Sequence, residues 1–260
     1  MKGIISCFLL AFVLISCSSG DRDNESVNAV ILPKTCTSIS PSGNTTTEYQ
    51  YDGNKIKSII ASNGSKSMIT YTGNLITKLV THDSSGAITS ETNFEYKNNR
   101  LSKKNFKIGL LNTDTFYTWI DDNHVSIEDN SYKPQNAIDK TELYFSNGNV
   151  VKSTNHTHYP NNYTIDKVDI IESDTQNNPF KNVEGYSLIS FDINSDFFFQ
   201  SNNILQIRTT RTGIVNGEPM SERYYRNFEL SYTDKNYPQS YVVKSSYGST
   251  YSYEFSYFEN

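Results

Sequence analysis

Two histidines one residue apart, His156 and His158, are the first residues of the chain whose spacing could support chemistry. In a β-strand this spacing places both imidazoles on one face, as some metal sites do. The nearest further ligands, Asp166 and Asp169, are distant in the sequence. Because Tyr159-Pro160 follows directly, we expect an exposed bend and predict neither a metal site nor a cofactor.

Catalytic residues of other kinds are not indicated. The sequence contains no Gly-x-Ser-x-Gly motif and no glycine-rich phosphate loop. Acidic residues such as Asp52, Asp121 and Asp122 lie at predicted turns, where aspartate is favoured for conformational reasons alone. We therefore nominate no catalytic residue. A glycan-active hydrolase with two acidic residues is the alternative to a non-enzymatic protein.

Tyrosine is abundant, with 19 copies in 260 residues. Aromatic residues at matching positions of successive hairpins become cross-strand neighbours, and we expect this role for most of them. Exposed tyrosines could instead stack on sugar rings. For the C-terminal group Tyr247, Tyr251, Tyr253 and Tyr257 both alternatives stay open, and these four are the candidate ligand-stacking residues.

The N-terminus carries a different chemical signal. Lys2 precedes an uncharged apolar run over 4–15, which is too short for the roughly 20 apolar residues of a membrane span and is typical of a secretory signal. The run closes with Leu14-Ile15-Ser16-Cys17, which resembles the lipobox of bacterial lipoproteins. That resemblance implies cleavage before Cys17 and acylation of its thiol, giving a membrane anchor without a spanning helix. An ordinary signal peptide ending in cysteine is the alternative.

We expect a signal peptide over 1–16 and a flexible tether over 17–30, because residues 18–26 are small and polar. The acidic residues of the tether also resemble the surface-export signal of Bacteroidota lipoproteins. Loss of Lys2 takes the basic residues from 23 to 22 against 28 acidic ones, a net charge of −6, so nucleic acid is not an expected partner. With Cys17 acylated, Cys36 is left as a lone and inert thiol.

Asparagine-containing turns recur along the remaining chain. Their spacing is near-regular over the first five copies, and an aromatic residue stands three or four positions before each. The turns are aligned on Asn54, Asn74, Asn99, Asn123, Asn149, Asn203 and Asn236. Hairpin turns need positive φ, which glycine and asparagine reach at least cost, so each copy predicts a hairpin tip.

The repeat Tyr-x-Tyr-Asp-Gly-Asn-x-Ile over 49–56 and its degenerate copies resemble the YD-type hairpin repeats of RHS-like proteins. They are more similar to the uncharacterised Bacteroidota lipoproteins built from such repeats, which share an Asn-Pro-aromatic element like Asn178-Pro179-Phe180. The resemblance implies a β-hairpin architecture and an envelope location. It implies no activity.

The fold expected for 31–260 is a single all-β domain of consecutive antiparallel hairpins that form one long curled or rolled meander sheet. Alternation predicts strands over 165–171 and 251–258, and Pro179 predicts a loop over 175–181. The segment 183–199 fits one short helix or another strand, and we favour the helix.

The basic stretch Arg100 to Lys107 has two interpretations. Its cations could contact an anionic glycan or a lipid head group. We favour protection of an edge strand against pairing with another chain, a role that lysine serves well.

The sequence thus predicts a lipid-anchored protein of the cell envelope, located at the outer membrane. The acidic tether further suggests that the protein is exposed on the cell surface. The expected partners are the membrane, through the anchor, and a polysaccharide or an envelope protein.

Overall fold

The computed structural model describes residues 30–130, 137–160, 163–189 and 201–258, which form sixteen β-strands and one 3₁₀ turn, η1, at Tyr186–Leu188. No α-helix occurs within these ranges. The strands are β1 Leu32–Ser40, β2 Gly43–Asp52, β3 Lys55–Ala61, β4 Lys66–Thr72, β5 Leu75–His82, β6 Ile88–Lys97, β7 Arg100–Ile108, β8 Leu111–Asp121, β9 His124–Asp129, β10 Ile138–Ser146, β11 Asn149–Tyr159, β12 Tyr163–Ser173, β13 Ile204–Val215, β14 Glu218–Tyr232, β15 Pro238–Ser245 and β16 Thr250–Phe258.

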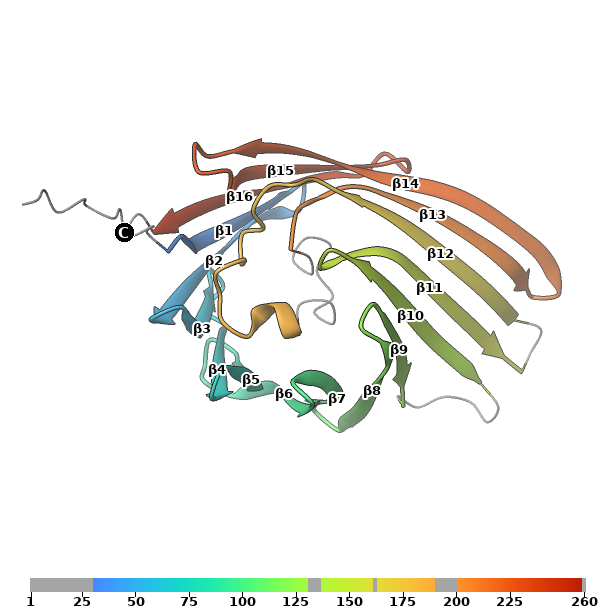
Figure 1. The fold of residues 1–260 in the computed structure, drawn as a ribbon, viewed down its shortest axis with the longest axis horizontal. Coiled ribbons are helices and arrows are strands. Elements are labelled where there is room, and N and C mark those ends of the chain that lie inside the picture. Colours follow the sequence, from blue (N-terminus) through green and yellow to red (C-terminus); the bar gives the residue numbers. More distant parts are fainter. Residues whose placement is uncertain (1–29, 131–136, 161–162, 190–200, 259–260) are drawn as a thin grey trace, which may run out of the picture.

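The strands close into an antiparallel barrel (Figure 1). Each strand pairs with the next along the chain, and β1 pairs with β16 from Leu32 opposite Phe258 to Ile39 opposite Ser252. The expected all-β meander of hairpins is confirmed, but the expectation of a merely curled or rolled sheet is wrong. Closure joins strands at opposite ends of the sequence, and local alternation carries no information about that pairing.

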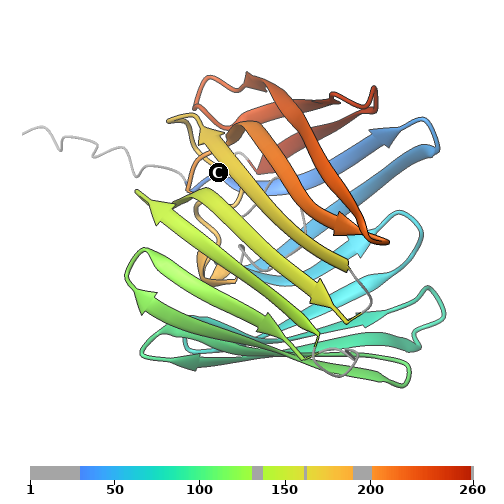
Figure 2. The same cartoon turned by 90° about the vertical axis from the view of Figure 1, so that its right-hand side faces the viewer.

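The strands predicted over 165–171 and 251–258 are confirmed as parts of β12 and β16. The edge-strand interpretation of the basic stretch is wrong, because β7 pairs with both β6 and β8. Lys103 instead forms an ion pair with Asp114, at 3.2 Å. Figure 2 shows the wall from the side, with β10 to β14 running obliquely across it.

The first five repeats turn at one end of the barrel, here named the asparagine end, through the two-residue turns 53–54, 73–74, 98–99, 122–123 and 147–148. Positive φ is supplied by Gly53, Gly73, Asn98, Asn99 and the Asn147-Gly148 pair. The hairpin tips are thus confirmed for these copies, although Asn149 lies one residue past its turn, in β11.

Hydrogen bonds of the aromatic residues in the repeat link neighbouring hairpins. The apolar residue just after each of the five turns is buried, and in three successive copies the aromatic residue of the next repeat forms a hydrogen bond with its backbone. The backbone N–H of Ile56 donates to Tyr71 Oη at 3.1 Å, Tyr96 Oη donates to the Ile76 carbonyl at 2.7 Å, and Trp119 Nε1 donates to the Leu101 carbonyl at 3.0 Å. Each aromatic therefore joins its hairpin to the preceding one.

Removal of one such hydroxyl tests this role. We expect Tyr96→Phe to lower the free energy of unfolding by about 1 kcal/mol, because a half-buried carbonyl loses its donor. Tyr144→Phe is the control, since that hydroxyl bonds to Glu142 on the outer face, and it should change stability by roughly 0.5 kcal/mol or less. Chemical denaturation of both variants measures the difference, and equal losses would contradict the role.

The connection after β12 folds into the barrel, and its first described part, residues 174–189, is named the plug (Figure 1). The Phe180 ring stacks on Tyr186, with centroids 4.6 Å apart, and meets Tyr49 of β2 edge-on at 5.2 Å. The Glu184 N–H donates to the Asn54 carbonyl at 3.0 Å. The plug thus fills the lumen at the asparagine end with apolar side chains.

The loop expected over 175–181 is confirmed, since it contains no strand. The helix expected within 183–199 is reduced in the described part to η1, which starts after Gly185 in the left-handed region at φ 73, without a side-chain cap. Residues 190–199 of that expectation lie outside the described residues.

Candidate binding site in the barrel lumen

Directly opposed residues of an antiparallel pair share one face, so the register identifies the inner face of the wall. Along β13, Ile207 belongs to the buried core, and Thr209 and Arg211 follow it on the same face. Along β12 the same face carries Ile171, Asp169 and Lys167. The lumen is thus apolar near the plug and becomes polar toward the opposite end, here named the open end.

A cavity of about 230 Å³ lies on the inner face between β7 and β11. It is lined by Lys104, Thr115, Ile127, Asp129, Asp139, Thr141 and Asn155. The Asn155 amide donates to Asp139 Oδ1 at 2.8 Å and to Thr141 Oγ1 at 3.0 Å. The Thr157 hydroxyl donates to Asn155 Oδ1 at 2.9 Å. These bonds fix the direction of both Asp139 and Asn155.

A row of charged residues continues this polar surface across the next strands. Lys167 stands opposite Asn155 on one side and opposite Arg211 on the other, and Arg211 stands opposite Glu222. Each cation has a carboxylate partner: Lys167 Nζ lies 2.8 Å from Asp169 Oδ2, and Arg211 lies 3.3 Å from Glu222. The row therefore offers donors and acceptors without an excess of either charge.

The four candidate tyrosines do not form one platform. Tyr251, Tyr253 and Tyr257 lie on the inner face of β16, and the Tyr257 hydroxyl donates to the Pro238 carbonyl at 2.6 Å. Burial raises the pKa of Tyr257 far above its ordinary value. Tyr247 lies in the turn before β16, where it is 69% exposed and its ring meets Tyr224 at 5.2 Å. Ligand stacking by the four stays a prediction.

His156 and His158 lie in β11, so the exposed bend expected around them is wrong; the strand runs through to Tyr159. Both point outward. His156 Nδ1 lies 2.6 Å from Asp166 Oδ1, and His158 Nδ1 lies 3.0 Å from the Thr164 hydroxyl. Among the described residues no group of three His, Cys, Asp or Glu side chains could hold a metal ion.

Cys36 is buried on the inner face of β1, and desolvation raises the pKa of its thiol from 9.0 to about 12. At pH 8 we expect alkylation to be about a thousandfold slower in the folded protein than in denaturant. Because the unfolded thiol ionises first, the free energy of unfolding should fall as the pH rises above 9. Iodoacetamide labelling of the Cys7→Ala, Cys17→Ala double variant, whose remaining thiol is that of Cys36, measures the rate with and without guanidinium. Equal rates would show that Cys36 is accessible.

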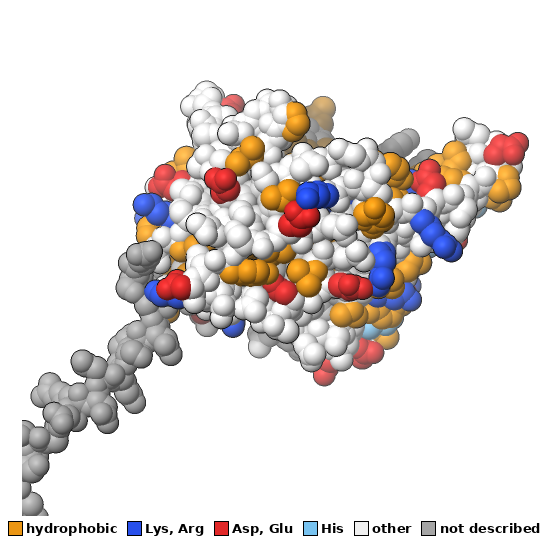
Figure 3. All heavy atoms as spheres, turned by 90° about the horizontal axis from the view of Figure 1, so that it is seen from above, with side chains coloured by type: hydrophobic (Ala, Val, Ile, Leu, Met, Phe, Trp, Pro, Cys, Tyr) orange, Lys and Arg blue, Asp and Glu red, His pale blue; other side chains and the backbone are white. Residues whose placement is uncertain are grey.

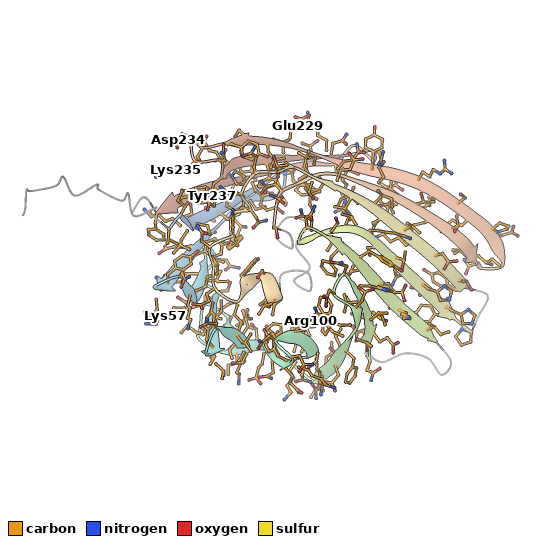
Figure 4. All side chains as sticks on the ribbon, in the orientation of Figure 1. Lys57, Arg100, Glu229, Asp234, Lys235 and Tyr237 are labelled. Carbon is orange, nitrogen blue, oxygen red and sulfur yellow. The ribbon has the colours of Figure 1, made fainter. Side chains whose placement is uncertain are left out.

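The outer face of the wall is charged along its length. Ion pairs join neighbouring strands there between Lys78 and Glu91, Arg208 and Glu172, and Lys244 and Glu229. Lys140 and Glu142 form a further ion pair within β10. Figure 3 shows acidic and basic side chains interspersed with separate apolar ones over one side of the barrel. Figure 4 shows Lys57 and Glu229 pointing away from the ring of strands.

The sequence analysis did not identify the residues of the cavity and of the charged row as a site. The alternation in 165–171, which puts Lys167 and Asp169 on one face of a strand, was the available sequence signal for part of that row. Which face points inward follows only from closure.

Comparison with solved structures matches the chain to a porin-like protein from Bacteroides uniformis ATCC 8492, with a TM-score of 0.50 and 8% identity. The match covers 88% of this chain and 96% of that protein. It shows a shared barrel fold. No family model matches, and no curated protein does. Within the described ranges, no helix is long and apolar enough to cross a bilayer.

Proposed function

We propose that this protein is a non-enzymatic lipoprotein of the cell envelope, anchored through Cys17, whose barrel stands in water beside the membrane. Its polar lumen binds a polysaccharide or an envelope protein. The likeness to a porin-like protein is consistent with a location at the outer membrane.

The observation that carries this proposal is the charged outer wall. A barrel that spans a bilayer presents an apolar band to lipid, and a lysine or arginine at the midplane costs about 2–4 kcal/mol. Here Lys78, Lys103, Lys140 and Lys244 lie within strands on the outer face, each beside an acidic side chain. Water solvates such a surface, whereas hydrocarbon does not.

The inner face supports the same proposal. Membrane barrels with a channel have a polar interior, whereas this barrel packs Phe180, Val183, Tyr186 and Ile189 against its wall at the asparagine end. The asparagine end of the lumen is thus filled by an apolar core, whereas charged side chains lie on the outer face and, toward the open end, on the inner face. A lumen filled at one end favours a barrel in water over an open pore in lipid.

The tether fits this placement. Cys17 and Val30 are 13 residues apart, so the chain between them spans at most about 45 Å. Because β1 begins at the asparagine end, the anchor would enter from that side and leave the open end of the lumen free for a partner.

Two measurements on the full chain in a bacterial host test the proposal. Palmitate labelling should occur in the wild type and in Cys36→Ala but not in Cys17→Ala, since only Cys17 carries the lipid. A protease site inserted after Ser26 should allow the protease to release the barrel from washed membranes into detergent-free buffer.

Label that persists in Cys17→Ala would refute the anchor. A cut barrel that stays in the membrane after an alkaline wash would refute its placement in water.

A further inference from the structure

We propose that the inner-face cavity between β7 and β11 binds one ring of a neutral saccharide, and that the adjacent charged row binds the neighbouring sugars. This inference rests on the proposed placement of the barrel in water, because the open half of the lumen must be accessible to a hydrophilic ligand.

The functional groups of the cavity match hydroxyl groups. A sugar hydroxyl donates one hydrogen bond and accepts others, so it is best bound by adjacent acceptors and donors. Asp139 supplies a carboxylate, Asn155 an amide and Lys104 an ammonium group on the same face. The bond of 2.8 Å between Asn155 and Asp139 holds both side chains in place before a ligand arrives.

The balance of charge argues against an anionic ligand. Lys104 faces two carboxylates in the cavity, those of Asp129 and Asp139. In the adjacent row Lys167 and Arg211 each have a carboxylate partner. A phosphate or polyanion site needs an excess of positive charge, which these residues do not provide.

Size and shape support a sugar ring. Pockets for drug-sized ligands are about 300–1,000 Å³, so a cavity of about 230 Å³ is suited to a smaller group. Ile127 supplies an apolar wall among the polar ones, against which the C–H face of a ring can pack. The inner face thus offers both kinds of contact that a pyranose requires.

The register shows where the rest of the ligand would lie. From Asn155 the row passes through Lys167 and Arg211 to Glu222, over three strand spacings of about 4.8 Å each. Tyr224 follows Glu222 on the same face of β14, and its ring meets Tyr247. An extended oligosaccharide could therefore run from the cavity to this aromatic pair.

Calorimetric titration of the protease-released barrel tests the site. The probes are the neutral trisaccharides of glucose, mannose, galactose and N-acetylglucosamine, with trigalacturonate as the anionic comparison. We expect at least one neutral probe to bind with millimolar or tighter affinity, and Asp139→Asn and Lys104→Ala each to weaken it at least tenfold. The matched control, Asp166→Asn on the outer face, should bind like the wild type.

Thermal unfolding of each variant shows whether its barrel is intact, and Thr141→Val replaces any variant that does not fold. Absence of binding by every neutral probe, binding of trigalacturonate alone, or wild-type affinity in the cavity variants would overturn the inference. Release of the barrel by the protease tests the anchored placement and is measured independently of sugar binding. A released barrel that binds no sugar therefore refutes the saccharide site and leaves the anchored placement intact.

Discussion

Replacement of Gly213 by alanine is expected to destabilise the barrel by about 3 kcal/mol or more. A Cβ on Gly213 would lie 1.9 Å from the carbonyl oxygen of Thr164 and 3.0 Å from the Cα of Ile165. Both are backbone atoms of the opposing strand, so no side-chain rotation relieves the clash. The pairing of β12 with β13 would therefore have to shift. Because these two strands carry the polar inner face beside the cavity, that face would be displaced as well.

Thermal unfolding measures this effect, with a midpoint about 6–12 °C lower than that of the wild type for a domain of this size. Gly217→Ala is the matched control. Within the described part of the chain no atom lies within 4 Å of its added methyl group, and only the positive φ of 85° opposes the change. That strain costs about 1–2 kcal/mol. Equal losses in the two variants would contradict the close approach at Gly213.

Truncation of Phe180 to alanine is expected to cost about 3–5 kcal/mol and to loosen the plug. The ring is 3% exposed and contacts both Tyr186 within the plug and Tyr49 in the wall. Its loss removes the main aromatic contact between plug and wall and leaves a cavity in the apolar half of the lumen.

Hydrogen exchange distinguishes this local effect from general destabilisation. In Phe180→Ala the amide of Glu184, which donates to Asn54, should exchange faster than the amides of the strands. Lys181→Ala is the control, because the Lys181 side chain is exposed and its ammonium group donates to Asn177, a neighbour within the plug. Uniform acceleration in all strands would show that the plug and the wall unfold as one unit.

The repeat predicted the hairpins because its signals are local. A glycine or asparagine at 53, 73 or 98–99 sets a turn by its own φ, and the alternation beside it sets two strands. The same turns could belong to an open or a closed sheet. Closure depends on the pairing of β1 with β16, more than 200 residues apart in the sequence, which no local pattern specifies.

The candidate site was hidden for a related reason. Lys104 was predicted as part of a protective basic stretch, and Asp139 and Asn155 carried no motif. Their meeting depends on the register of five neighbouring strands and on the inward direction of one face. Pro179 correctly predicted a loop, but only the apolar contacts of Phe180 place that loop inside the barrel.

The meeting of the first and last strands has a practical consequence. Since Leu32 and Phe258 are directly paired, the two ends of the barrel sequence lie side by side. A short linker could join them, and new termini could be cut at an exposed turn of the open end, such as Asn216-Gly217. Such circular permutants would keep every strand pair while moving the point of attachment to the opposite end of the molecule.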